Sequence, residues 1–289
     1  MSTTSTKLGE LDPMPSSQEQ NAARIAFVHT DEGVASPDVE EIVVPKYFQF
    51  RNWFDRTVAF LLLIPGLPIM LAVAILLILT SDGPIFYRQR RVGLRGKVFT
   101  LLKFRTMIPN AEKKTGPVWT SVNDPRITKV GKLLRPTHLD ELPQLFNVLM
   151  GEMMLIGPRP ERPEFTVRLA EKIPGYYNRN LITPGVTGLA QMNLPPDSDL
   201  ESVRRKLTLD LEYIKTGSFG QDFRIFCATF LRLIGVPGHQ CVRLTGVERS
   251  VTVPAYMYLE GVDGDLRDDK VPQTYVDEVA SKAMKAAKE

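Results

Sequence analysis

The hydropathy pattern of the chain is dominated by one long apolar segment. Residues 58–79 read VAFLLLIPGLPIMLAVAILLIL and carry no charge. A straight helix of this length would be about 33 Å long, enough to cross a bilayer core of about 30 Å. Pro65 and Pro68 interrupt the segment, and proline removes a helical hydrogen bond and clashes with the preceding turn. The pattern therefore predicts a break near the middle of the segment.

Basic residues flank this segment on both sides. They are Lys46, Arg51 and Arg56 before it, and Arg88, Arg90, Arg91, Arg95 and Lys97 after it. Positive flanks favour the cytoplasmic side of a membrane, so a straight span would carry one cluster to the other side. A helix–break–helix hairpin keeps both clusters on one side, although the carbonyl groups freed at the break need new partners. We therefore predict a re-entrant hairpin broken at Pro65 and Pro68, with a plain transmembrane anchor as the alternative.

After the apolar segment the pattern changes to short elements. The stretches GPIFYRQRRVG and KVFTLLKFRTM are typical of two strands around a glycine-rich turn at Gly93–Gly96. DPRITKVGKLLRPT leads into a helix, and residues 210–215 and 223–234 have the spacing of amphipathic helices. These patterns predict a mainly α fold with a few short strands. Together with the hairpin, they indicate a monotopic membrane protein with amphipathic helices at the bilayer interface.

Charge divides the chain into four segments. Residues 1–45 have a net charge of −6 and weak periodicity, which predicts a disordered acidic tail. Residues 46–83 hold the membrane-associated helix, residues 84–246 the main globular domain, and residues 247–289 an acidic extension of net charge −3. Because the whole chain has a net charge of +3, residues 46–246 carry +12. A basic body indicates an anionic partner, such as lipid headgroups, nucleotide phosphates or nucleic acid.

The number and spacing of the cysteines indicate the redox state of the protein's compartment. The chain has 289 residues but only two cysteines, Cys227 and Cys241. Neither their number nor their spacing fits a disulfide framework or a zinc site. This usage indicates a reducing compartment.

An adjacent acidic pair, Asp140 and Glu141, lies in the stretch THLDELPQLFNVLMGEMMLIGPRPE of residues 137–161. One interpretation is structural: Thr137 caps a helix, the acids favour the dipole of its first turn, and Gly151 ends it. The apolar positions of that helix share one face, namely Leu142, Leu145, Phe146 and Leu149. This interpretation explains the acidic pair without a catalytic or metal-binding role.

The basic residues around the pair support a second, chemical interpretation. Two carboxylates can bind Mg²⁺, which bridges carboxylate and phosphate oxygens, and guanidinium groups bind phosphate through paired hydrogen bonds. A carboxylate can also act as a nucleophile and form an acyl phosphate. The pair is then a candidate catalytic and magnesium site, Asp140 and Glu141, with phosphate held by Lys103, Arg105, Arg135 and Arg159.

Five motifs occur in order between residues 46 and 235: YRQRRVG, FTLLKFRTM, DPRITKVGKLLRPTHLDELPQLFNVLMGEMMLIGPRPE, PGVTGLAQMN and LDLEYI. With the proline-interrupted apolar segment, they make the chain resemble the bacterial sugar transferases, also called monotopic phosphoglycosyl transferases. The resemblance implies a two-step reaction at the cytoplasmic face of the bacterial inner membrane. A UDP-sugar is attacked at its β-phosphate and UMP leaves. The sugar phosphate then passes from the enzyme to polyprenyl (undecaprenyl) phosphate.

The resemblance also implies roles for residues of this sequence. Asp140 would be the nucleophile, and Glu141 its partner in the Mg²⁺ site or in proton handling. The basic positions that match the family motifs and would hold phosphate are Lys103, Arg135 and Arg159. Pro68 matches the proline that breaks the re-entrant helix of the family.

Two further points follow from the resemblance. Residues 84–246 would be the catalytic domain, facing the cytoplasm, and the product would start the assembly of an exopolysaccharide or another glycan. Many relatives have a Trp and an NGR sequence near PGxTG, where this chain has Leu189 and Leu194. Contacts to the sugar and nucleotide are therefore not carried over to this loop.

Two other function classes compete with the enzyme. A non-catalytic membrane scaffold that binds anionic lipid would explain the basic body and the apolar segment, but not the acidic pair among arginines. A nucleic-acid binder would explain only the basic body, and no nucleic-acid motif is present, so we expect no nucleic-acid partner. The motifs do not separate glucose, galactose, N-acetylhexosamines or diamino sugars, and they leave the glycan pathway and the oligomeric state open.

Overall fold

The computed structural model describes residues 42–112 and 124–258, and this part is mainly helical with two small sheets, as predicted. Most of the predicted acidic tails lies outside the described residues. The long elements are α2 (Tyr47–Thr80), β1 (Phe86–Val92), β2 (Val98–Phe104), α5 (Pro163–Lys172), α7 (Leu200–Thr216), α8 (Phe219–Leu233) and α9 (Gly238–Thr245). The short ones are η1 (Leu94–Gly96), α3 (Lys129–Leu134), η2 (Leu139–Glu141), α4 (Gln144–Met150), β3 (Met154–Ile156), η3 (Tyr176–Asn180), β4 (Gly185–Thr187), α6 (Leu189–Asn193) and η4 (Ala255–Met257).

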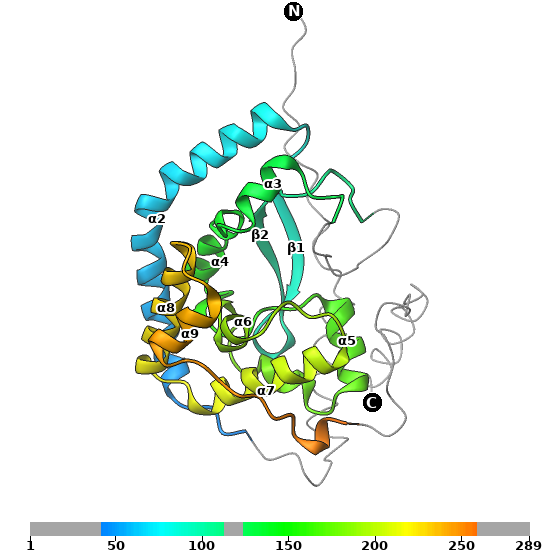
Figure 1. Cartoon of the computed structure of the whole chain (residues 1–289). Helices are drawn as coiled ribbons and strands as arrows, with labels where there is room; N and C mark the ends of the chain where they lie inside the picture. The colour runs from blue at the N-terminus through cyan, green and yellow to red at the C-terminus, as the bar shows by residue number, and fades with distance from the viewer. Residues whose placement is uncertain (1–41, 113–123, 259–289) are drawn as a thin grey trace, which may run out of the picture.

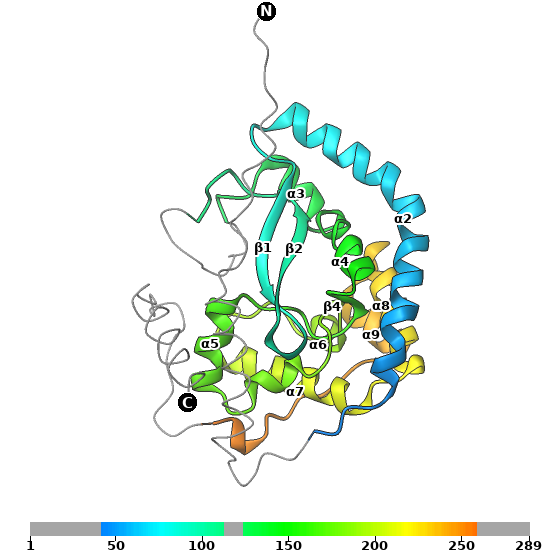
Figure 2. The same ribbon diagram turned by 180° about the vertical axis from the view of Figure 1, so that it is seen from behind.

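The apolar segment forms the middle of one long helix, α2. Pro65 and Pro68 lie inside this helix, so the predicted separation into two helices is not observed. Figures 1 and 2 show α2 curving around one side of the body. Both prolines are exposed, whereas Gly66 between them is buried and faces Leu145. A helix can continue past a proline by bending, and packing along its inner side offsets the lost hydrogen bonds.

One side of α2 packs against the body along its whole length. Its buried positions recur every three or four residues: Phe48, Arg51, Asp55, Ala59, Leu63, Gly66, Met70, Val73 and Leu77. Large apolar side chains remain exposed elsewhere on the helix, including Phe60, Ile64, Leu67, Leu71, Ile75 and Ile78. An exposed apolar surface of this size marks an interaction with lipid or with another apolar partner. Within the described ranges, α2 is the one helix long and apolar enough to cross a membrane.

Both ends of α2 are bound to the same body. Near the N-terminal end, the buried Arg51 guanidinium lies 2.5 Å from the carboxylate of Asp222 on α8. At the C-terminal end, Arg105 donates hydrogen bonds to the Asp82 carbonyl at 2.6 Å and to the Ser81 hydroxyl at 2.6 Å. An arginine at this position complements the unpaired carbonyl groups and the negative end of the helix dipole. The helix therefore lies along the body and does not project away from it.

The predicted strand pair is confirmed as the antiparallel hairpin β1–β2, which turns at the predicted glycine-rich segment. The buried side chain of Asn147 on α4 ties the helix to this hairpin. Its amide donates to the Thr100 carbonyl at 2.8 Å, and its oxygen accepts from the Leu102 N–H at 3.0 Å. The hairpin, α4 and the middle of α2 share one apolar core, which includes Leu63, Met70, Val73, Leu77, Leu101, Phe104, Leu145 and Val148.

Helices α5–α9 and the parallel pair β3–β4 enclose a second core. The predicted amphipathic helices belong to α7 and α8. Along α8 the side chains of Asp222, Ile225 and Ala228 are buried. A stripe of apolar side chains stays exposed on the other side, formed by Phe219, Phe223, Phe226, Phe230, Leu233 and Ile234. The amphipathic character of α8 is therefore confirmed.

The packed body continues beyond residue 246. Val247 and Met257 are each only 1% exposed and belong to the second core. Arg204 on α7 donates to the Met257 carbonyl at 3.1 Å, and its guanidinium lies 4.4 Å from the centre of the Tyr258 ring. The described start of the acidic extension thus packs along α7.

Candidate active site

The acidic pair lies in a tight turn between two short helices. Thr137 donates its hydroxyl to the carbonyls of Leu133 and Leu134, at 3.1 and 3.0 Å, so it closes the end of α3. His138 follows with a left-handed backbone (φ 52°), and η2 then carries the two acids. The predicted cap at Thr137 is therefore wrong, because this left-handed residue separates it from the next helix. The predicted end at Gly151 is confirmed by its left-handed conformation (φ 80°).

Glu141 holds two cations at a single oxygen. Its Oε1 accepts from Lys103 Nζ at 2.6 Å and from Arg159 Nη2 at 2.6 Å. Burial alone would raise the pKa of Glu141, but Arg159 and Lys103 lower it well below its usual range. Glu141 is therefore ionised at neutral pH and positions the two cations side by side.

Asp140 is in a different environment, although it is the next residue. Its side chain is buried, and no hydrogen bond or ion pair joins it to another described residue. Burial raises the pKa of Asp140; Lys103 opposes this shift, and the charge of Glu141 adds to it. Neighbouring acids whose pKa values move apart are typical of catalytic pairs. Asp140 is thus a carboxylate with its oxygens uncommitted, beside a region of positive charge.

The other predicted phosphate-binding residues differ in position. Burial lowers the pKa of Arg135, and the nearby charge of Asp140 opposes this shift. The Nε of Arg135 donates to the Thr106 hydroxyl at 2.9 Å. Arg105, by contrast, uses both terminal nitrogens at the end of α2. The structure therefore brings Lys103, Arg135 and Arg159 together with the acids and leaves Arg105 engaged elsewhere. A phosphate role for Arg105 stays a prediction that would require these contacts to exchange.

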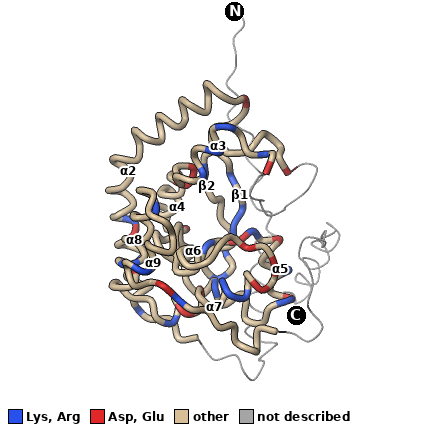
Figure 3. Tube along the Cα trace, viewed as in Figure 1, with Lys and Arg blue, Asp and Glu red and all other residues tan. Residues whose placement is uncertain are grey.

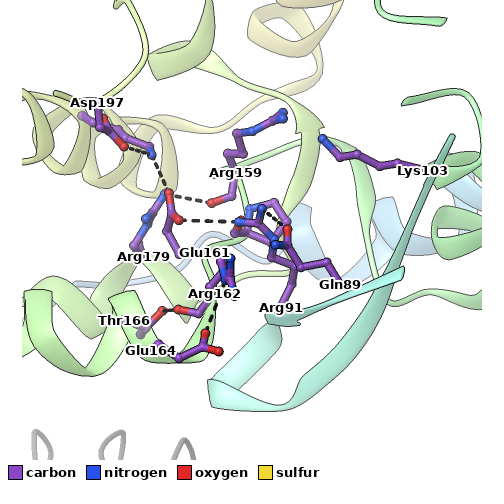
Figure 4. A network of polar contacts seen from close by, with 12 residues as sticks. Gln89, Arg91, Lys103, Arg159, Glu161, Arg162, Glu164, Thr166, Arg179 and Asp197 are labelled. Atoms are coloured by element: carbon purple, nitrogen blue, oxygen red, sulfur yellow. Dashed lines mark hydrogen bonds and ion pairs between the residues drawn. The ribbon is translucent and has the colours of Figure 1, made fainter. Parts of the chain in front are cut away.

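Arg159 is positioned by backbone contacts on both sides of it. The Arg179 guanidinium donates to the Arg159 carbonyl at 2.9 Å, and Arg91 donates to the Pro160 carbonyl at 2.8 Å. The preceding carbonyl, on Pro158, accepts from a backbone N–H in β4 at 2.9 Å. Figure 4 shows the Arg159 side chain extending from this segment toward Lys103. The proline-flanked segment thus presents one guanidinium to the site in a fixed orientation.

A buried ionic network lies beneath this segment (Figure 4). Glu161 lies 2.8 Å from Lys206 Nζ, which also lies 2.6 Å from Asp197. Arg179 lies 2.7 Å from Asp210 of α7. Sequence reasoning missed this network, because its members are distant in the chain. The one signal available was that Glu161 and Asp210 stand inside the motifs GPRPE and LDLEYI.

Glu161 makes the stability of this region dependent on pH. Burial alone would raise its pKa, but Lys206 and Arg91 lower it below the ordinary value of 4.5. A depressed folded-state pKa contributes stability that is fully present above the unfolded pKa, and this contribution is lost progressively as the pH falls from about 4.5 through the lowered folded-state pKa. We expect Glu161→Gln to lower the free energy of unfolding by about 3 kcal/mol at pH 7, because Lys206 and Arg91 lose a buried partner.

Thermal unfolding of the two proteins at pH 7 and pH 3 checks this prediction, because the lower pH lies well inside the window in which Glu161 takes up its proton. The wild type is expected to lose more stability between these pH values than Glu161→Gln. Glu164→Gln is the matched control, because Glu164 is 40% exposed and lies 3.5 Å from Arg162, so its removal should change stability by less than about 0.5 kcal/mol. Equal pH dependence in wild type and Glu161→Gln would contradict the prediction.

The site fits a metal ion that is shared with a substrate. Among the described residues no group of three or more His, Cys, Asp or Glu side chains could hold a metal by itself. Mg²⁺ commonly takes only one or two carboxylates and completes its shell with water and substrate phosphates. Asp140 offers uncommitted oxygens for this, and Glu141 has one oxygen beyond that shared by Lys103 and Arg159. These side chains therefore suit an ion that is also bound by substrate phosphate, and they do not form a complete metal site by themselves.

These features describe a protein with one long apolar helix suited to a membrane and a buried acidic pair beside basic side chains that could bind phosphate. Figure 3 shows the long uncharged course of α2 beside a body in which basic and acidic positions gather. The sequence model of the family described as bacterial sugar transferase matches residues 46–235. This range covers well over half of the chain and includes both α2 and the acidic pair. The chain belongs to the bacterial sugar transferase family.

Individual relatives agree with this assignment. A UDP-glucose:undecaprenyl-phosphate glucose-1-phosphate transferase of Xanthomonas campestris pv. campestris is 39% identical over 183 residues, 63% of this chain and 38% of that protein. A UDP-N-acetylgalactosamine-undecaprenyl-phosphate N-acetylgalactosaminephosphotransferase of Aeromonas hydrophila is 38% identical over 190 residues, 66% of this chain and 45% of that protein. The uncharacterized sugar transferase EpsL of Bacillus subtilis (strain 168) is 37% identical over 199 residues, 69% of this chain and 94% of that protein.

The chain thus spans about two fifths of the length of the first two relatives and matches nearly all of the third. The names of the first two contain different sugars, glucose and N-acetylgalactosamine. Similarity at this level therefore does not select a sugar for this chain.

Proposed function

We propose that this protein transfers a sugar 1-phosphate from a UDP-sugar to undecaprenyl phosphate, and thereby starts the assembly of an exopolysaccharide or another glycan. The observation that carries the proposal is the contrast within the acidic pair. Glu141 is fixed by Lys103 and Arg159, whereas Asp140 is buried beside the same cations with uncommitted oxygens. The names of the first two relatives support the donor and acceptor classes.

In the first step a carboxylate oxygen of Asp140 attacks the β-phosphorus of the UDP-sugar. The bond between that phosphorus and the bridging oxygen breaks, and UMP leaves with the bonding electron pair. Lys103 and Arg159 lie where they can bind the oxygens on which negative charge develops, which is the main protein contribution to phosphoryl transfer. Arg159 uses one terminal nitrogen on Glu141, and its remaining N–H groups can bind phosphate. The product of this step is an aspartyl sugar phosphate.

In the second step a phosphate oxygen of undecaprenyl phosphate attacks the phosphorus of this intermediate. The acyl–phosphate bond breaks, Asp140 regains its carboxylate, and a polyprenyl diphosphate sugar leaves. A phosphate monoester is largely ionised at neutral pH, so the attacking oxygen needs no general base. The covalent intermediate lets one site serve a water-soluble donor and then a lipid acceptor.

Mg²⁺ would be held by Asp140 and Glu141 together with phosphate oxygens of the substrate. When bound, it supplies positive charge that neutralises the phosphates of the donor. Lys103, Arg135 and Arg159 add to this charge from the protein side.

We also propose that α2 is re-entrant, with the catalytic domain on the cytoplasmic side of the inner membrane. The body packs along the whole inner side of α2 and binds both of its ends, so the two ends belong on the same side of the bilayer. The bend at the two prolines gives the helix room to dip into one leaflet with its apolar outer side in lipid.

Labelling of single cysteines tests this topology. Val43 and Lys97 are exposed and lie on opposite sides of α2 in the sequence. In Val43→Cys and Lys97→Cys, a membrane-impermeant maleimide is expected to react at both positions in inside-out vesicles and at neither in intact spheroplasts. The parent chain, with Cys227 and Cys241, provides the baseline. Labelling of the two positions from opposite sides would favour a helix that spans the membrane.

The reaction itself is tested by UMP release from the protein in nanodiscs, with Mg²⁺, undecaprenyl phosphate and a panel of UDP-sugars. Release with one donor would establish the reaction and identify the sugar. Absence of release and of any sugar-phosphoryl adduct across the panel, with folded protein, would count against the proposed function.

A further inference from the structure

Arg232 occupies an unusual position at the C-terminal end of α8. It follows Ile225 and Ala228 at intervals of seven and four residues, so it lies on the side of α8 that faces the body. Both of those side chains are buried, yet Arg232 is exposed. The guanidinium therefore starts on the inner side of the helix and remains accessible to solvent.

This region borders the phosphate site. One turn before Arg232, the Thr229 hydroxyl lies 3.0 Å from the Thr187 hydroxyl of β4. The Thr187 carbonyl accepts from the Gly157 N–H at 2.9 Å, two residues before Arg159. Arg232 itself donates to the Gln191 carbonyl of α6 at 3.3 Å. The end of α8 is thus fixed against the segment that presents Arg159.

On its other side, Arg232 adjoins the apolar surface. Phe230, Leu233 and Ile234 are exposed neighbours in sequence on the outer side of α8. That surface continues onto α2, because the rings of Phe54 and Phe219 are 5.8 Å apart in an edge-to-face contact. Figures 1 and 2 both show α8 beside α2. Arg232 thus stands at the boundary between this exposed apolar surface and the segment that presents Arg159.

We propose that Arg232 binds the phosphate of the lipid acceptor and guides it from the membrane surface to Asp140. Arginine has five N–H donors in a planar arrangement that suits phosphate, and Arg232 uses one of them on Gln191. No ion pair joins it to a carboxylate in the described part of the chain. This inference rests on the proposed function for the identity of the acceptor.

The position favours the acceptor over the donor. A polyprenyl phosphate keeps its hydrocarbon chain in the bilayer, so its phosphate reaches the protein at the edge of the apolar surface. A UDP-sugar is water-soluble, so it can reach the site without contacting the edge of the apolar surface. A phosphate group bound at Arg232 would also approach the site from the side of the segment that presents Arg159.

Binding of farnesyl phosphate to the full chain in nanodiscs, measured by calorimetry, tests the proposal without turnover. Farnesol, which lacks the phosphate, is the ligand control. We expect Arg232→Ala to weaken farnesyl phosphate binding by about tenfold or more, which is the effect of losing one charged hydrogen-bond pair, and Arg232→Lys to weaken it less. Arg224→Ala is the matched control, because Arg224 is also exposed on α8 and is expected to leave binding unchanged.

A second measurement separates the acceptor from other phosphate sources. UMP released in a single turnover without acceptor reports donor binding and intermediate formation, and Arg232→Ala is expected to keep its amplitude while transfer to undecaprenyl phosphate falls. Unchanged farnesyl phosphate binding in Arg232→Ala would overturn the proposal. The proposal would also be overturned if Arg232→Ala lost the single-turnover UMP release while it still bound farnesyl phosphate. That result would indicate that Arg232 binds the donor. An equal loss of binding to phosphatidylglycerol vesicles would make Arg232 a general headgroup contact.

The outcomes also separate this inference from the proposed function. A wild type that binds farnesyl phosphate through Arg232 but releases no UMP would leave the acceptor site standing and count against the transfer reaction. A wild type that releases UMP but binds farnesyl phosphate equally well in Arg232→Ala would do the reverse.

Discussion

Replacing Asp140 with asparagine is expected to stop sugar-phosphate transfer while the protein remains folded and membrane-bound. The amide has the same shape as the carboxylate but is a far weaker nucleophile. UMP release should fall by at least about 10³-fold, and the sugar-phosphoryl adduct should disappear from intact-protein mass spectra. A variant that retains substantial turnover, or still forms the adduct, would remove Asp140 as the nucleophile. Asp140→Ala should give the same result and excludes recovery by hydrolysis of the amide.

The pKa of Asp140 allows loss of chemistry to be separated from loss of folding. An acid whose pKa is raised in the folded state binds protons more tightly there, so its ionisation at neutral pH costs stability. Asp140→Asn removes this cost and should leave the melting temperature unchanged or slightly higher. Asp82→Asn, at an exposed aspartate, is the matched control and should keep full activity. A melting temperature that falls together with activity would indicate that Asp140 supports the fold.

The part of the site that could be predicted from sequence is the part encoded by neighbouring residues. Asp140 and Glu141 are adjacent, and Arg135 is five residues before Asp140, so their proximity follows from the chain itself. The strand pair that carries Lys103 could also be predicted, because a glycine-rich turn connects two short apolar stretches.

The structure adds what depends on three-dimensional packing. The left-handed backbone of His138 and the use of the Thr137 hydroxyl on α3 decide where the next helix begins. The different environments of the two acids arise from Lys103 and Arg159, which come from distant parts of the chain. Arg105 shows the same limit: it stands in a basic motif, but the end of α2 occupies its guanidinium.

The long helix shows how tertiary contacts outweigh a local signal. Two prolines three residues apart predict a break, and the basic flanks predict two ends on one side. The inner stripe of α2 packs on the body along its whole length, and these contacts keep the helix continuous through a bend. The sequence thus indicated a disturbance at the two prolines and a long apolar surface, while the continuity of the helix depends on packing partners such as Leu145 and Val148.

Gly185→Ala is expected to be among the most destabilising single changes in the described body, although it adds one methyl group. A Cβ at this position would lie 2.0 Å from the Gly157 backbone nitrogen and 2.6 Å from its Cα. These atoms belong to the backbone of the segment that presents Arg159, so no side-chain rotation can relieve the clash. We expect a loss of about 2–4 kcal/mol in unfolding free energy, or roughly 5–15 °C in melting temperature.

The same substitution should also reduce catalysis in the protein that remains folded. Relief of the clash must move the 157–160 segment away from β4, and a displacement of about 1 Å at Arg159 is enough to lower phosphoryl transfer by roughly 10²-fold. Gly220→Ala is the control, because nothing lies within 4 Å of a Cβ there and alanine favours the helix, so stability should be equal or higher by up to about 1 kcal/mol. Thermal unfolding and UMP release of both variants in nanodiscs test the predicted losses of stability and catalysis. If Gly185→Ala has the same melting temperature as the wild type, the backbones at Gly185 and Gly157 can separate without cost, and the prediction is wrong.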